Sequence, residues 1–102
     1  MEALEALYTR RSIKGFTDRM PTEEEIEKVT KAGVAAPTGM GMQASYIVVV
    51  KNRELRDELS RMNAEVLGTA ADPFYNAPVI IVVVAAKSRG TYVCDGSLVI
   101  GN

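Results

Sequence analysis

Val79-Ile80-Ile81-Val82-Val83-Val84-Ala85-Ala86 is the most hydrophobic stretch of the chain. These apolar residues, and the turn-rich residues 72–78 before them, predict a buried β-strand. Upstream, residues 46–50 form a shorter β-branched run whose lack of polar alternation predicts a strand covered on both faces. With a helix between them the two strands have the spacing of a βαβ unit, which leaves open whether they are neighbours in a sheet.

The segment between the strands has helical periodicity. It begins at Arg53, and Gly68 is suited to close it. Charged residues occupy the other faces of the helix, so its apolar stripe predicts the side that packs on the core. That stripe consists of Leu55, Leu59, Met62 and Val66.

A second helix is predicted from the sequence Thr22-Glu23-Glu24-Glu25. This is a capping box, in which the Thr22 hydroxyl accepts from the Glu25 amide and the Glu25 carboxylate reaches back to the cap. Pro37 stops the helix. Its predicted inner stripe is Ile26, Val29, Ala32 and Gly33.

Two further helices are predicted at the ends of the chain. Residues 2–9 place Leu4, Leu7 and Tyr8 on one face, which is typical of a short amphipathic helix. Residues 91–102 resemble the opening of another helix, but their glycines and β-branched residues give it poor intrinsic helicity. We therefore expect tertiary packing to hold that last helix.

The composition is that of a small folded domain, with 47% hydrophobic and 25% charged residues among 102. A net charge of −1 provides no positive field, so we expect no nucleic-acid partner. A sequence without histidine has no Ser-His-Asp triad and no histidine zinc site, and we expect no metal site. The single cysteine, Cys94, fits a reducing cytoplasm and is interpreted as a small buried hydrophobe.

The longest apolar run, residues 77–86, contains Pro78 and is too short to span a bilayer, so we expect no membrane partner. Two buried strands do not make a stable sheet by themselves. We therefore expect residues 1–102 to be a single partial domain, cut from a larger fold or completed by another subunit.

Residues 10–16 concentrate positive charge where the first helix should end. Arg10 and Arg11 offer planar donor forks that match phosphate, Ser12 adds a hydroxyl and Lys14 adds a mobile charge. The cluster therefore indicates an anion site. The alternative is a solvated basic face favoured by the dipole of the preceding helix.

Four motifs follow one another in a specific order along the chain. They are Arg10-Arg11-Ser12-Ile13-Lys14, Ala36-Pro37-Thr38-Gly39-Met40, Asp72-Pro73-Phe74-Tyr75-Asn76-Ala77-Pro78 and Asp95-Gly96-Ser97. With these motifs the chain resembles the N-terminal half of the FMN-dependent nitroreductase family over essentially all of its 102 residues. The second motif is not a P-loop, because no Lys-Ser or Lys-Thr follows at the required spacing.

The resemblance implies an α+β, nitroreductase-like fold in truncated form, with helices flanking a small sheet and a partner subunit completing it. It also implies a homodimer or higher oligomer that binds FMN between subunits. NADH or NADPH would reduce the flavin, which would then reduce nitroaromatics, quinones or another small-molecule electron acceptor. Because the flavin carries the hydride chemistry, we expect no catalytic side chain.

The resemblance also implies a candidate set of cofactor-binding residues. One subunit would hold the FMN phosphate and ribityl chain with Arg10, Arg11, Ser12 and Lys14. The other subunit would approach the flavin with Pro37, Thr38 and Gly39, followed by Gly41 and Gln43. Gly41 replaces an asparagine common in the family, whereas Gln43 keeps the family's amide.

Two functions of different classes remain open. The first is a nitroreductase-like oxidoreductase, which in this half-length form would need a second chain to complete its flavin site. The second is a non-catalytic module that oligomerises or binds a partner through its open strand edges. Nucleic-acid binding through the basic cluster is disfavoured by the overall charge.

Overall fold

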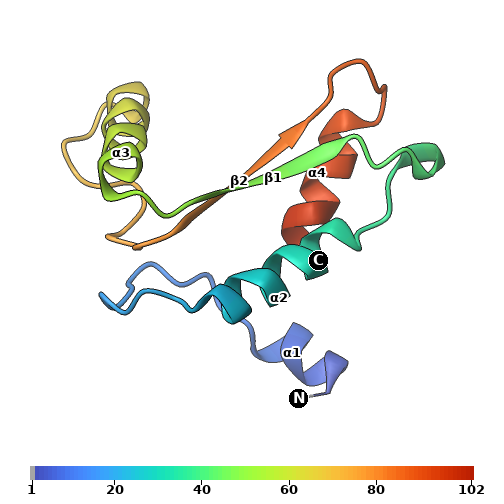
Figure 1. The fold of residues 1–102 in the computed structure, drawn as a ribbon, viewed down its shortest axis with the longest axis horizontal. Helices are drawn as coiled ribbons and strands as arrows, with labels where there is room; N and C mark the ends of the chain where they lie inside the picture. The colour runs from blue at the N-terminus through green and yellow to red at the C-terminus, as the bar shows by residue number, and fades with distance from the viewer. Residues whose placement is uncertain (1) are drawn as a thin grey trace.

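The computed structural model describes residues 2–102, which form helices around a two-stranded sheet (Figure 1). The α+β class expected from the sequence is confirmed. In chain order the elements are α1 (Ala3–Thr9), α2 (Glu23–Val34), the 3-10 helix η1 (Gly39–Gly41), β1 (Ser45–Val50), α3 (Arg53–Leu67), β2 (Ile80–Ala85) and α4 (Tyr92–Gly101).

The two strands are neighbours and run antiparallel, with Ser45 opposite Ala85 and Val50 opposite Ile80. The βαβ interpretation of their spacing is therefore wrong. A βαβ helix crosses a face of the sheet, whereas α3 lies at one end of the strands and the chain re-enters β2 beside the end of β1 (Figure 1).

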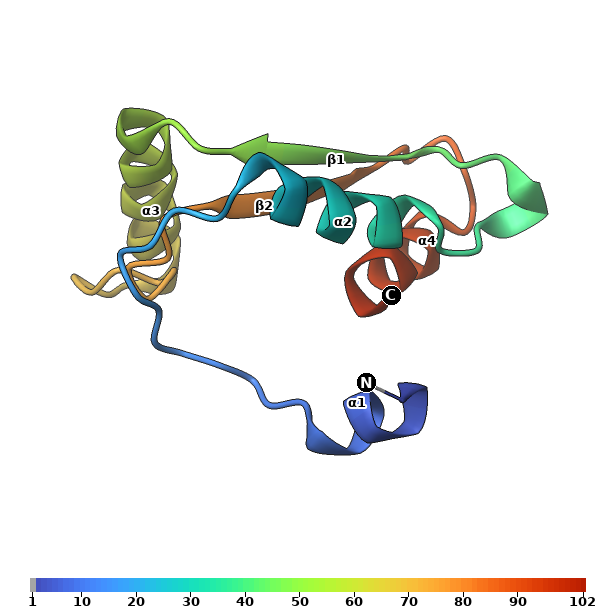
Figure 2. The same ribbon diagram turned by 60° about the horizontal axis from the view of Figure 1, so that its bottom comes forward.

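Helices α2 and α4 cover one face of this sheet (Figure 2). The buried apolar residues of the core come from these helices, the following loop and β1: Ile26, Ala36, Val50 and Val99. Gly33 permits the close packing of α2, because a Cβ atom there would lie 2.7 Å from Ile47 Cδ1. Val29 and Ala32, predicted in the same inner stripe, are exposed.

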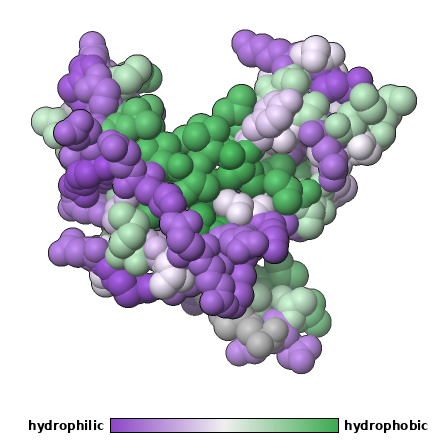
Figure 3. Space-filling model, viewed as in Figure 1, coloured by the Kyte–Doolittle hydropathy of each residue, from purple (hydrophilic) through white to green (hydrophobic). Residues whose placement is uncertain are grey.

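The opposite face of the sheet is open. Tyr46 and Val48 of β1 alternate with more buried neighbours and are themselves exposed, so the prediction of a strand covered on both faces is wrong for this chain alone. Hydrophobic surface accordingly gathers over the strands in the space-filling view (Figure 3). The radius of gyration, 15.1 Å, also exceeds the value of about 13 Å for a compact domain of this length.

Helix α3 turns inward a polar side that is next to the predicted apolar stripe, of which Leu59 is half-buried. Arg56 and Ser60 are its buried residues, while Leu55 and Met62 are half exposed and Val66 is 86% exposed. The core-facing stripe predicted from hydrophobicity is thus wrong. An ion-pair network, described below, holds the buried polar side.

The predicted helix ends are largely confirmed. Thr22 Oγ1 accepts from the Glu25 amide at 3.1 Å, and Gly68 closes α3 with a left-handed φ of 69°. The reciprocal half of the capping box is wrong, because the Glu25 carboxylate accepts from Arg19 at 3.1 and 3.0 Å instead. Helix α1 forms as predicted, but its apolar face is exposed.

Cys94 is exposed on α4, so its interpretation as a buried hydrophobe is wrong. Within residues 2–102, no helix has the length and hydropathy needed to cross a membrane. Over the same residues, no group of three or more histidine, cysteine, aspartate or glutamate side chains could hold a metal ion.

Candidate functional site

The predicted basic cluster lies where α1 ends. Arg10 caps the helix, its amide donating to the Ala6 carbonyl at 3.1 Å. The Arg11 guanidinium donates only to backbone, at 3.3 Å to Thr9 O and 3.1 Å to Arg10 O. Ser12 and Lys14 follow in an extended, exposed segment.

Among the described residues, no carboxylate lies within ion-pair distance of Arg10, Arg11 or Lys14. In the described part of this structure no neighbouring carboxylate therefore offsets their positive charge. Seven of the nine other basic side chains are held in ion pairs, whereas within residues 2–102 Lys87 and Arg89 are not: the paired ones are Arg19, Lys28, Lys31, Lys51, Arg53, Arg56 and Arg61.

The second predicted group, Pro37 to Gln43, forms a tightly wound loop around η1. Thr38 organises it from within, because its carbonyl accepts from the Gly41 amide at 3.1 Å and its hydroxyl from the Gln43 amide at 2.9 Å. Gly41 has a φ of 66° and open space where a side chain would be, so the backbone there is accessible to a ligand.

The structure thus brings each predicted group together but does not join the two. In both ribbon views η1 lies well away from α1 and the basic segment after it (Figures 1 and 2). No hydrogen bond among the described residues connects the groups. The two groups therefore do not form one joined site within the described chain.

Asp95, the first residue of the motif Asp95-Gly96-Ser97, lies against the loop. Its carboxylate accepts from the Gly39 amide at 3.0 Å and from the Thr91 hydroxyl at 2.8 Å. The signal in the sequence was one acidic residue within an otherwise uncharged helix. That pattern is typical of a buried carboxylate, but it does not identify the partner, Gly39, which is 56 residues away in the sequence.

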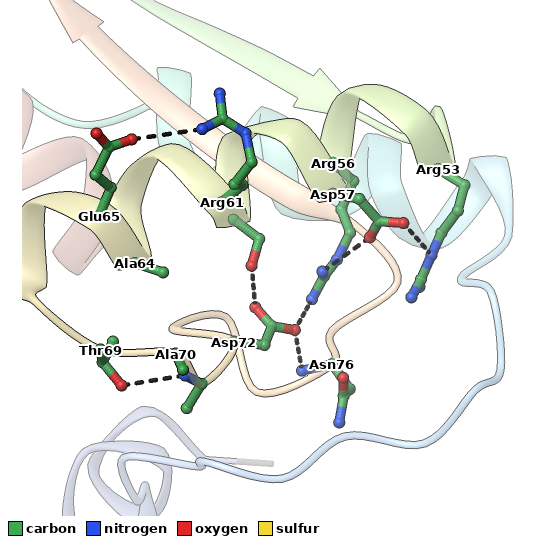
Figure 4. A pocket seen from close by; sticks show the side chains of 12 residues that line it. Arg53, Arg56, Asp57, Arg61, Ala64, Glu65, Thr69, Ala70, Asp72 and Asn76 are labelled. Atoms are coloured by element: carbon green, nitrogen blue, oxygen red, sulfur yellow. Dashed lines mark hydrogen bonds and ion pairs between the residues drawn. The ribbon is translucent and has the colours of Figure 1, made fainter.

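A separate polar network lines a hollow of about 560 Å³ between α3 and the loop that leads to β2 (Figure 4). Asp72 is at its centre and accepts from the Arg56 guanidinium, from Ser60 Oγ at 2.7 Å and from the Phe74 and Asn76 amides at 2.9 Å. Arg56 also donates to the Ala77 carbonyl at 2.8 Å.

Burial by itself would raise the pKa of Asp72, but the hydrogen bonds from Arg56, Ser60 and the two amides outweigh it. The pKa of Asp72 therefore lies well below its ordinary value. A carboxylate held ionised by four donors is not free to move a proton. We interpret the network as structural, since it holds Tyr75 and Asn76 in left-handed backbone conformations, with φ of 53° and 60°.

A comparison with protein families assigns the chain to a family. The model described as the nitroreductase family matches residues 7–95. This chain belongs to the nitroreductase family. The matched range includes both predicted groups, the Asp72 network and Asp95.

Curated relatives within the nitroreductase family are longer than this chain. A protein of Archaeoglobus fulgidus, provisionally named NADH dehydrogenase/NAD(P)H nitroreductase, is 35% identical over 94 residues, covering 92% of this chain and 51% of the relative. A Bacillus subtilis protein named FMN reductase (NADPH) is 40% identical over 57 residues, 56% of this chain and 23% of the relative. The chain spans about half the length of the Archaeoglobus fulgidus relative and about a quarter of the Bacillus subtilis relative.

Solved nitroreductase structures show the same fold. A Bacteroides fragilis nitroreductase with bound FMN superposes with a TM-score of 0.87 at 20% identity, covering 99% of this chain and 61% of that one. A Desulfitobacterium hafniense nitroreductase with bound FMN superposes with a TM-score of 0.81 at 28% identity. The superposition covers 96% of this chain and 60% of the D. hafniense chain. The nitroreductase-like fold expected for this chain is confirmed, over a little more than half of the full fold.

Proposed function

We propose that this chain forms the FMN-phosphate-binding half of an NAD(P)H-dependent oxidoreductase that reduces nitroaromatics, quinones or similar acceptors in the cytoplasm. The observation that carries the proposal is the uncompensated charge of Arg10, Arg11 and Lys14 in a chain whose other basic residues are mostly paired. Family membership supports FMN as the anion, since related structures contain it.

Bound FMN would supply the hydride and electron transfer between NADH or NADPH and the acceptor. Arg10 and Arg11 each present a planar fork that can hold phosphate oxygens, and Lys14 adds a third charge. The exposed Ser12 hydroxyl is free to donate one further hydrogen bond. These residues bind and orient the cofactor and transfer no proton.

In a homodimer the loop of the second subunit would complete the site. Pro37, Thr38 and Gly39 shape that loop, and the open space at Gly41 lets its backbone approach a flat ring closely. Gln43 carries the amide that could hydrogen-bond a ring heteroatom. The exposed apolar face of the sheet supports a protein partner of this kind.

That same surface favours a second candidate function, a non-catalytic module that assembles through its open sheet. The two proposals differ in one observable property. An oxidoreductase half-site binds FMN and perturbs the visible flavin band, whereas a module that only assembles leaves free-flavin absorption unchanged.

Titration of the purified chain with FMN, followed by flavin absorption and fluorescence, tests the proposal. We expect Arg10→Ala and Arg11→Ala each to weaken binding about tenfold or more, because each removes charged hydrogen bonds to phosphate. Arg61→Ala is the matched control, since Arg61 is exposed but paired with Glu58 and Glu65. Equal affinities for all three variants, or a free-flavin spectrum with the unaltered chain, would overturn the proposal.

A further inference from the structure

Asp95 joins α4 to the loop that contains η1. The residue is 4% exposed, and both of its carboxylate oxygens are used, one by the Gly39 amide and the other by the Thr91 hydroxyl. A negative charge in the first turn of α4 is also favoured by the helix dipole. The dipole accounts for an acidic residue in this turn but not for its bond to a distant loop.

The loop that Asp95 contacts has a strained backbone. Met40 and Gln43 have left-handed φ values of 56° and 47°, which side-chain-bearing residues adopt only at an energetic cost. Met40 is 89% exposed, so burial of its side chain does not stabilise this conformation. Strained conformations persist only where surrounding contacts impose them. The Asp95 carboxylate and the internal bonds of Thr38 are such contacts.

Gly39 is fitted closely against the same anchor. A Cβ atom at Gly39 would lie 2.3 Å from Thr91 Oγ1, much closer than any real contact. The glycine therefore lets the loop backbone approach α4 until its amide reaches the carboxylate. The connection before α4 also touches the loop, because the Arg89 guanidinium lies 3.7 Å from the Met40 sulfur.

We infer that Asp95 is a positioning residue that fixes the shape of residues 38–43 through the Gly39 amide, and so presents this loop to the flavin. The role toward flavin rests on the proposed function, whereas the hold on the loop does not. Without the carboxylate, the Gly39 amide loses its acceptor inside the packed contact and the strained residues are free to relax.

Amide hydrogen exchange tests the hold on the loop directly. In Asp95→Ala we expect the Gly39, Gly41 and Gln43 amides to exchange about tenfold to a hundredfold faster, while β1 and the later turns of α4 keep their protection. Ser97→Ala, an exposed change on the same helix, is the matched control and should leave all these amides unchanged. Uniformly faster exchange throughout the chain would mean a general loss of stability and would overturn the inference.

Asp95→Asn provides a rescue. Its amide oxygen can accept from Gly39 and its amide nitrogen can donate to the Thr91 hydroxyl, although without the strengthening that charge gives. We expect loop exchange in Asp95→Asn to fall between that of the unaltered chain and that of Asp95→Ala. An asparagine variant that behaves like the alanine variant would overturn the role of the two hydrogen bonds.

FMN titration of the same variants tests the role toward flavin. We expect Asp95→Ala to weaken binding about tenfold and to shift the bound-flavin spectrum toward that of free flavin, with Asp95→Asn partly restoring both. If the unaltered chain binds no FMN, the proposed function fails, and the exchange data alone decide whether Asp95 holds the loop. If it binds FMN and Asp95→Ala binds equally well, the inferred role of Asp95 toward flavin is overturned while the proposed function stands.

Discussion

Replacing Asp72 should be among the most damaging single substitutions in this chain. Its carboxylate accepts from Arg56, Ser60 and two backbone amides, and Arg56 is 2% exposed. Asp72→Ala leaves the Arg56 charge buried with two partners, the Ala77 carbonyl and Asp57. Removing one member of a buried ion pair costs about 3–5 kcal/mol, mostly because the remaining charge cannot be solvated.

The partners that remain set the expected value within that range. Because Asp57 still accepts from Arg56 at 3.1 Å, we expect the free energy of unfolding to fall by about 3 kcal/mol, the lower limit. Asp57→Ala is the matched control. Its carboxylate pairs with the same arginine but its side chain is 51% exposed, so its loss should cost less than about 1 kcal/mol.

Urea unfolding followed by circular dichroism, at one protein concentration for all variants, measures both changes. A fixed concentration is needed because self-association adds to apparent stability. Equal losses of less than about 1 kcal/mol for Asp72→Ala and Asp57→Ala would refute the reasoning, since burial would then make no difference to the value of an ion pair.

Three further predictions follow from other features. The pKa of Asp72 is lower in the folded than in the unfolded chain. The ionised carboxylate therefore stabilises the folded chain fully above about pH 4, and this stabilisation is lost as the pH falls below that value. Asp72→Asn should flatten the dependence of the urea midpoint on pH between about 5 and 2. Gly68→Ala should lower the free energy of unfolding by about 1 kcal/mol, and with it the melting temperature, because residue 68 has a positive φ. Gly15 also borders open space but has no positive φ, so Gly15→Ala should not lower the melting temperature. The exposed faces of the sheet and of α3 predict self-association, which sedimentation velocity checks; a single monomeric species at micromolar concentration would contradict it.

Local signals in the sequence predicted the helices and strands correctly. Thr22 and Gly68 mark the ends of their helices because a capping hydroxyl and a left-handed residue act on backbone groups only a few positions away. The two β-branched runs became β1 and β2 for a similarly local reason. The candidate flavin residues were found as two groups, each within a span of seven residues or fewer, and their roles stay a prediction.

The errors concern relations between distant segments. Hydrophobic periodicity predicted that Leu55 and Met62 would face the core, but the bond between Arg56 and the distant Asp72 turned the polar side of α3 inward. Strand spacing resembled a βαβ unit, but pairing is decided by which end of β1 the chain returns to. The predicted cover on both faces of β1 failed because the described chain supplies helices for one face.

The amino-acid sequence by itself determined the family, the element types, most element boundaries and the unusual basic cluster after α1. These depend on residue identities and on interactions within a few positions, which a linear pattern records. The tertiary structure alone decided the antiparallel pairing, the inward side of α3 and the contact of Asp95 with Gly39. Each of these depends on contacts between residues far apart in the sequence, and the free energy of those contacts exists only once the chain has folded.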